Sequence, residues 1–187
     1  MKELIGTHNS ATGEQSKNII LSLFTIFSRT QTKTLKQQYK AGCRLFDLRI
    51  RFNEKNIPYF CHGLWKSNKD VFEALRELNE ANETCYIGIT YEGEPKNIMG
   101  EYNEDGFKTW AENLFLTYRN LKPAYIAIKK PVWKSLYGNP EIKTKQGFTN
   151  LDGSTWHTYI PIPWLWDVLL TRPHKFNTEY YTLVDFL

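Results

Sequence analysis

Cysteine is scarce in this sequence and follows no recognisable spacing. The chain of 187 residues contains only three cysteines, Cys43, Cys61 and Cys85. An odd, widely spaced set argues against a disulfide framework, and no pair has the spacing of a metal-binding motif. Each thiol lies in or beside an apolar run, so we expect all three to be buried and free.

Long apolar runs and a strong excess of charge are also missing. No segment reaches the roughly 18 apolar residues of a membrane span, and the first apolar residues lead straight into a glycine turn rather than forming a signal peptide. We therefore expect a cytoplasmic chain, or one that is already processed or recombinant. The formal net charge is only +4, which predicts no nucleic-acid partner. No feature indicates an oligomeric state.

Four common catalytic signatures do not occur. There is no Gly-x-Ser-x-Gly elbow, P-loop, Rossmann glycine pattern or His-Glu-x-x-His helix, which argues against the enzyme classes that depend on them. Aromatic residues, in contrast, make up 15% of the chain. Many follow Tyr159, in "YIPIPWLW", where they either pack in the core or form a rim that meets a lipid interface.

Short apolar strands alternate with amphipathic helices, which predicts a single α/β domain over residues 1–187. The predicted strands are 3–5, 44–51, 58–61, 85–90, 124–128 and 181–187, and the predicted helices are 30–42, 67–82 and 104–121. After Pro131, repeated prolines predict loops or a mix of strands and loops. The chain is short for a complete (β/α)8 barrel of about 250 residues. We expect a small, distorted TIM-type barrel with short or missing helices; a doubly wound sheet is the alternative.

Each predicted helix has a boundary signal or an apolar face. Gly42 is expected to end the first helix, and Ser67 or Asn68 to cap the second. The apolar faces of the second and third helices are expected to be Val71, Phe72, Leu75 and Leu78, and Phe107, Trp110, Leu114 and Tyr118.

The strand "RLFDLRIR", residues 44–51, carries two charges on one face. Alternation places Asp47 and Arg49 together, opposite Phe46, Leu48 and Ile50. Two charges on an otherwise apolar strand are costly unless they are paired or used. The pair is therefore either a structural ion pair or part of an active site at the carboxyl end of a barrel strand.

Further chemical groups lie in turns and at strand ends. His8 lies in the turn "GTHNSAT", His62 ends a strand, Glu92 follows one, and Asp185 lies in the last strand. Either histidine alone is most simply an incidental turn or strand-end residue. Two histidines and an arginine, however, are what phosphodiester cleavage needs: one histidine accepts a proton, the other donates one, and the cation neutralises charge on the phosphate oxygens.

Three motifs occur in a fixed order: "GTHNSAT" at 6–12, "QYKAGCRLFDLRIR" at 38–51 and "CHG" at 61–63. Together they resemble the X-domain signature of phosphatidylinositol-specific phospholipase C, most closely the small bacterial type. The ending "LVDFL" is similar to the family's late barrel strand bearing an aspartate. The resemblance covers about the first half and the extreme end of the chain, and residues 96–180 match no family that we can name.

The resemblance implies a distorted TIM-type barrel that cleaves phosphatidylinositol-type lipids at a membrane surface through a cyclic inositol phosphate. It assigns His8 as the general base, His62 as the general acid and Arg49 as the phosphate-binding arginine. Asp47 is the strand companion of Arg49, and Asp185 holds the base in position. The enzyme would thus be a phosphoric diester hydrolase, or phosphorus–oxygen lyase.

Asn9 departs from the bacterial pattern, which usually has aspartate there. In the calcium-dependent animal type this position is asparagine and binds the metal, so Asn9, Asp47 and Glu92 are the candidate Ca²⁺ ligands. Arg49, however, stands where the calcium type has another acid, and its charge would repel a second cation. We therefore expect no cofactor, with Asn9, Asp47, Glu92 and Tyr91 binding substrate. The strand-four lysine of the bacterial inositol pocket is missing from "ITYEGE".

The run "NIILSLFTIF", residues 18–27, is the longest apolar stretch. It predicts either a buried helix or, by resemblance, a rim helix in which Phe24 and Phe27 touch a membrane. Two other functions remain open: a catalytically inactive, phospholipase-like module of a larger assembly, and the same chemistry on another glycerophosphodiester.

Overall fold

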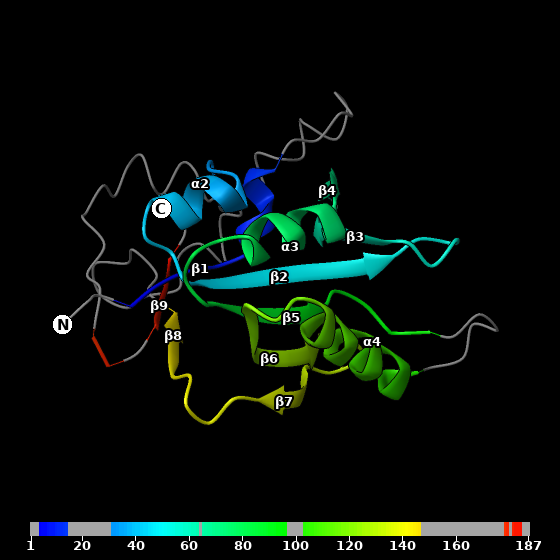
Figure 1. The fold of residues 1–187 in the computed structure, drawn as a ribbon. Helices are drawn as coiled ribbons and strands as arrows, with labels where there is room; N and C mark the ends of the chain where they lie inside the picture. Colours follow the sequence, from blue (N-terminus) through cyan, green and yellow to red (C-terminus); the bar gives the residue numbers. More distant parts are fainter. Residues whose placement is uncertain are drawn as a thin grey trace, which may run out of the picture.

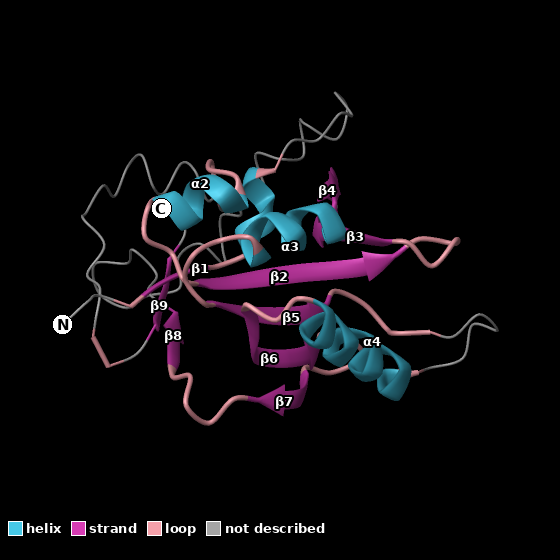
Figure 2. Ribbon diagram, viewed as in Figure 1, coloured by secondary structure: helices cyan, strands magenta, loops and turns pink. Residues whose placement is uncertain are grey.

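The computed structural model describes residues 4–14, 31–63, 65–96, 103–146, 178–179 and 181–184. They form one nine-stranded sheet with three α-helices (Figures 1 and 2). The strands are β1 (Ile5–Thr7), β2 (Leu45–Phe52), β3 (Pro58–His62), β4 (Trp65–Asp70), β5 (Cys85–Tyr91), β6 (Leu121–Ile128), β7 (Lys134–Gly138), β8 (Thr144–Gln146) and β9 (Tyr181–Val184). The helices are the 3-10 turn η1 (Ser10–Gly13), α2 (Leu35–Lys40), α3 (Val71–Asn79) and α4 (Glu104–Thr117).

The central strands are parallel, as predicted. The sheet order is β7-β6-β5-β2-β1-β9-β8, and all neighbours from β6 to β8 pair in parallel. The edge strand β7 and the β3–β4 hairpin are antiparallel additions. In the described part of the chain no pairing joins β7 to β8, so the sheet is open between them. This mixed α/β sheet with few helices agrees with the predicted small, distorted barrel.

Alternation along the parallel strands separates two faces of the sheet. Phe46, Leu48 and Ile50 are fully buried and belong to the core that also contains apolar side chains of α2, α3 and α4. Asp47 and Arg49 lie on the opposite face, as predicted from the period of two. The helices therefore cover one face, and the charged side chains are collected on the other.

The start of α3 differs from the prediction. Residues 65–70 form the strand β4, which pairs with β3, so neither Ser67 nor Asn68 caps a helix. The N-cap is Asp70, whose carboxylate accepts a hydrogen bond from the backbone N–H of Glu73 at 2.8 Å. Phe72, predicted to be on the apolar face, is 39% exposed, and Ala74 takes the buried position instead.

The other two helices follow the prediction more closely. Gly42, with φ of 100°, lies just beyond the C-cap of α2 and allows the chain to turn into β2. Phe107 and Leu114 of α4 are buried, and Trp110 and Tyr118 pack against the same core. Both helices are shorter than predicted, because α2 begins at Leu35 and α4 ends at Thr117.

The remaining expectations about the fold can be compared with the structure where they concern described residues. The three cysteines are free and buried, as expected. Among the described helices, none is long and apolar enough to cross a membrane. The run 18–27 with Phe24 and Phe27, the aromatic stretch after Tyr159, and Asp185 lie outside the described residues.

Candidate active site

A tight turn after β1 presents His8 and Asn9. Asn9 has φ of 45° and ψ of 47°, a left-handed conformation that asparagine tolerates better than most residues. The turn is anchored to α2: the Thr7 hydroxyl donates to Oε1 of Gln38 at 2.7 Å, and Nε2 of Gln38 donates to the carbonyl oxygen of Ser10 at 2.7 Å. Because these anchoring side chains are buried, the turn is fixed in place.

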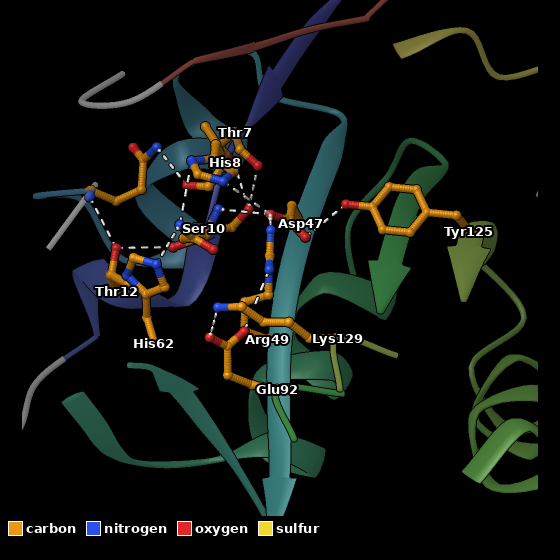
Figure 3. Close-up of polar contacts among 12 residues, drawn as sticks. Thr7, His8, Ser10, Thr12, Asp47, Arg49, His62, Glu92, Tyr125 and Lys129 are labelled. Atoms are coloured by element: carbon orange, nitrogen blue, oxygen red, sulfur yellow. Dashed lines mark hydrogen bonds and ion pairs between the residues drawn. The ribbon is translucent and has the colours of Figure 1, made fainter. Parts of the chain in front are cut away.

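The side chain of Asn9 connects the two histidines. Its amide nitrogen lies 3.3 Å from Nδ1 of His8 and 3.2 Å from Nε2 of His62. His8 follows β1 and His62 ends β3, and Figure 3 shows both rings on the same side of β2. Because both rings contact one amide nitrogen, they are close enough to contact a single phosphate-sized group.

Asp47, in the middle of β2, is the acceptor for several donors. Oδ2 accepts from the backbone N–H of Asn9 at 3.1 Å and from Nε and Nη2 of Arg49, both at 3.3 Å. Oδ1 accepts from the hydroxyl of Tyr125 at 2.7 Å. Nε2 of His8 lies 3.9 Å from Oδ2. The buried carboxylate of Asp47 therefore links the histidine turn, the arginine and β6 (Figure 3).

Arg49 continues a row of alternating charges. Its Nη1 lies 3.4 Å from Oε2 of Glu92, and Oε1 of Glu92 accepts from the ammonium group of Lys129. The row Asp47–Arg49–Glu92–Lys129 runs from the middle of β2 to the carboxyl ends of β5 and β6. Asp47 and Glu92 are almost fully buried, and such acids are stable only when paired in this way.

The pairing decides the ionisation of both acids. Burial, the largest influence, raises the pKa of Asp47, but Arg49, His8, the Tyr125 hydroxyl and the Asn9 N–H together hold it below its usual 3.8. Burial also raises the pKa of Glu92, while Lys129 and Arg49 lower it below its usual 4.5. Both groups are therefore carboxylates at neutral pH, and they keep the guanidinium of Arg49 fixed between them.

Two members of this cluster were not identified from the sequence. Tyr125 and Lys129 lie on and just after β6, on the face that carries Asp47 and Arg49. Tyr125 pairs with Gly88 of β5, and a Cβ at Gly88 would approach the Tyr125 ring to 2.1 Å. The glycine therefore leaves room for the phenol to cross β5 and reach Asp47. Active-site residues of such barrels lie at the carboxyl ends of the strands. Lys129 directly follows β6, so this rule would also have indicated it.

Tyr91 does not join the predicted substrate-binding residues. It belongs to the core on the opposite face of the sheet, where its ring packs edge-on against Phe107 of α4 with centroids 5.1 Å apart. The physical reason is alternation: Ile87, Ile89 and Tyr91 share one face of β5, so a side chain adjacent to Glu92 points the other way. The prediction that Tyr91 binds substrate is therefore wrong, because its side chain lies in the core.

The two acids among the candidate calcium ligands, Asp47 and Glu92, already have protein donors. Both oxygens of Asp47 and both oxygens of Glu92 accept from N–H or O–H groups, and Arg49 bridges the two acids. Within the described ranges, no three His, Cys, Asp or Glu side chains are grouped as metal ligands would be. Asp47 and Glu92 would have to exchange these donors for the ion, and Arg49 would have to move, so the two acids as they are paired do not fit a Ca²⁺ site.

Comparison with known proteins indicates the fold. No protein-family model and no curated protein matches the chain. Phosphatidylinositol-specific phospholipase C from Listeria monocytogenes matches over 98% of this chain and 72% of that one, with a TM-score of 0.51 and 16% identity. A double mutant of the S. aureus enzyme matches over 75% and 54%, with a TM-score of 0.53 and 15% identity. In another S. aureus structure the match spans 37% of that chain, with a TM-score of 0.47 and 21% identity. The chain thus has the fold of the bacterial phosphatidylinositol-specific phospholipases C.

Proposed function

We propose that this chain is an X-domain-type phosphodiesterase that cleaves phosphatidylinositol-type lipids at a membrane surface. The observation that carries the proposal is the Asn9 amide, which contacts both His8 and His62 next to the Asp47–Arg49 pair. Two imidazoles and a guanidinium around one small space are the groups that phosphodiester cleavage needs. A phosphate entering this space would replace the Asn9 amide as the partner of both rings.

In the proposed reaction, His8 accepts the proton of the inositol 2-hydroxyl as its oxygen attacks the phosphorus. The bond between phosphorus and the diacylglycerol oxygen breaks, and His62 donates a proton to that oxygen. The products are a cyclic inositol phosphate and diacylglycerol. Arg49 balances the charge that develops on the phosphate oxygens, while Asp47 and Glu92 keep it in position. The family resemblance adds Asp185 as the group that positions His8.

We also propose that the reaction needs no metal ion. Arg49 sits between the two acids that a calcium ion would use, and it is held there by both. A guanidinium can supply the charge compensation that a divalent ion supplies in other phosphodiesterases. Chelation by EDTA should therefore leave the rate unchanged.

The test is turnover of phosphatidylinositol in vesicles and of soluble glycerophosphoinositol, with products identified by 31P NMR. We expect cyclic inositol phosphate from both substrates. His8→Ala and His62→Ala should each lower kcat by about 10²–10⁴-fold, the contribution typical of a general acid or base. Arg49→Lys should lower kcat by about 10²-fold or more, since lysine lacks the planar guanidinium whose several N–H groups contact both acids.

Arg44→Lys is the matched control for Arg49→Lys. Arg44 lies just before β2, and its guanidinium is held by Glu83 at 2.8 Å and by the carbonyl oxygens of Tyr39 and Cys43 rather than by the acids of the candidate site. This variant should retain full activity. Loss of turnover with EDTA and its return with Ca²⁺ would refute the metal-independent reaction. No turnover of either substrate would favour an inactive binding module, and products without a ring would favour another glycerophosphodiester.

A further inference from the structure

The loop between β6 and β7 exposes apolar side chains beside two lysines. Val132 is 73% exposed and Trp133 is 53% exposed, and Lys129 and Lys130 immediately precede this part of the loop. Single exposed apolar residues are common on protein surfaces. Two adjacent ones next to cations at the edge of a candidate active site form a more specific pattern, because this combination is the one that lipid interfaces favour.

The loop is attached to the candidate site at three points. The Trp133 ring lies 5.8 Å from Cζ of Arg49, measured to the ring centroid. Lys129 pairs with Glu92, and the backbone N–H of Lys130 donates to the carbonyl oxygen of Gly93 at 3.3 Å. The exposed part of the loop therefore lies at the rim of the site, and a surface that it contacts is brought close to Arg49.

The charges on the loop indicate the kind of surface. Lys130 forms no ion pair with any described residue, whereas Lys134, farther along, is held by Glu104. An exposed lysine with no ion pair among the described residues, beside a tryptophan, fits the boundary of an anionic bilayer, where the ammonium group meets lipid phosphates and the indole lies at headgroup depth.

We propose that Lys130, Val132 and Trp133 form a membrane-contact surface that places the candidate site on an anionic lipid bilayer. This inference rests on the proposed function, because the contact would bring the candidate site to its lipid substrate. Binding to the bilayer itself does not require catalysis.

The test is binding of the chain to phosphatidylcholine vesicles with and without phosphatidylglycerol, measured by flotation. These vesicles contain no phosphatidylinositol, so binding is measured without turnover. The wild-type chain should bind the anionic vesicles. Val132→Asp and Trp133→Ala should each weaken binding about tenfold or more, because each removes apolar area from the interface. Lys130→Gln should weaken binding to anionic vesicles severalfold and leave binding to neutral vesicles unchanged.

Leu116→Ala provides the matched control. Leu116 is 76% exposed, but it lies near the end of α4. The eight residues of β6 separate that end from the loop by about 25 Å, at roughly 3.3 Å per residue. This variant should bind like the wild type, and circular dichroism should show that all variants fold.

Several results would overturn the proposal. They are failure of the wild type to bind anionic vesicles, unchanged binding by the Val132 and Trp133 variants, and equal loss in Leu116→Ala. Self-association that Trp133→Ala abolishes, without vesicle binding, would show that a second copy of the chain covers the loop. A His62→Ala chain should bind vesicles as the wild type does, so loss of the proposed activity is distinguishable from loss of membrane contact.

Discussion

The hydrogen bond from Tyr125 to Asp47 should make a measurable contribution to stability. Among the described residues, Tyr125 is the only donor to Oδ1 of Asp47, at 2.7 Å, and Asp47 is 1% exposed. Tyr125→Phe leaves that oxygen buried without a partner and changes little else in shape. Hydrogen bonds to charged groups are worth about 1.5–3 kcal/mol, so we expect the free energy of unfolding to fall by about 2–3 kcal/mol at neutral pH.

The loss should also depend on pH, with a sign fixed by the pKa of Asp47. That pKa is lowered from 3.8 in the folded chain, so the carboxylate stabilises the fold above this pH and the contribution is lost as the pH falls through the lower, folded-state pKa. Removal of the hydroxyl raises the pKa of Asp47. The difference in the free energy of unfolding between Tyr125→Phe and the wild type should therefore be largest at neutral pH. It should shrink at acidic pH, where Asp47 is protonated in both proteins.

Urea unfolding at a series of pH values, followed by circular dichroism, measures both effects. Tyr137→Phe is the control, because no described residue accepts a hydrogen bond from the Tyr137 hydroxyl, and the ring is also partly buried. Tyr137→Phe should lower the free energy of unfolding by less than about 0.5 kcal/mol. An equal, small loss for both tyrosine variants, or a Tyr125→Phe loss that does not change with pH, would refute the reasoning.

Three further experiments test the packing at Gly88, the cap of α3 and the burial of Cys43. Gly88→Ala should destabilise the chain by at least as much as Tyr125→Phe, because its Cβ would meet the Tyr125 ring; the cost should be smaller in a Tyr125→Ala background, as a double-mutant cycle of urea unfolding would measure. Asp70→Ala removes the cap of α3 and should cost about 1 kcal/mol in the same assay. Burial raises the pKa of the Cys43 thiol to about 12, so iodoacetamide at mildly alkaline pH should alkylate Cys43 only after unfolding, as mass spectrometry would detect.

The sequence was sufficient for features that depend on local periodicity. Alternation in 44–51 correctly separated Asp47 and Arg49 from the apolar face, because a period of two needs no knowledge of neighbouring strands. The residue after β6 is a different case. Lys129 follows a predicted strand, yet its role depends on Glu92 lying at the end of the adjacent strand, which only the sheet order reveals.

The failures have the same origin in tertiary structure. Residues 67–70 are polar and their sequence predicts the start of a helix, but pairing of β4 with β3 makes them part of a strand. Tyr125 reaches Asp47 because the register places it beside Gly88, and no property of 124–128 alone specifies that register. Tyr91 and Glu92 are both predicted to bind substrate, but adjacent residues of a strand face opposite sides of a sheet, so only one of them can face the site.

The row Asp47–Arg49–Glu92–Lys129 has a consequence for the response to ionic strength. Its acids are almost fully buried and Arg49 is only 12% exposed, so dissolved ions screen these pairs weakly. Lys130, in contrast, is exposed, and its attraction to an anionic bilayer is screened over about 10 Å at moderate salt. Added salt should therefore release the chain from vesicles while turnover of a soluble inositol phosphodiester continues. Ionic strength would therefore change the fraction of the protein bound to membranes and leave the geometry of its candidate site unchanged.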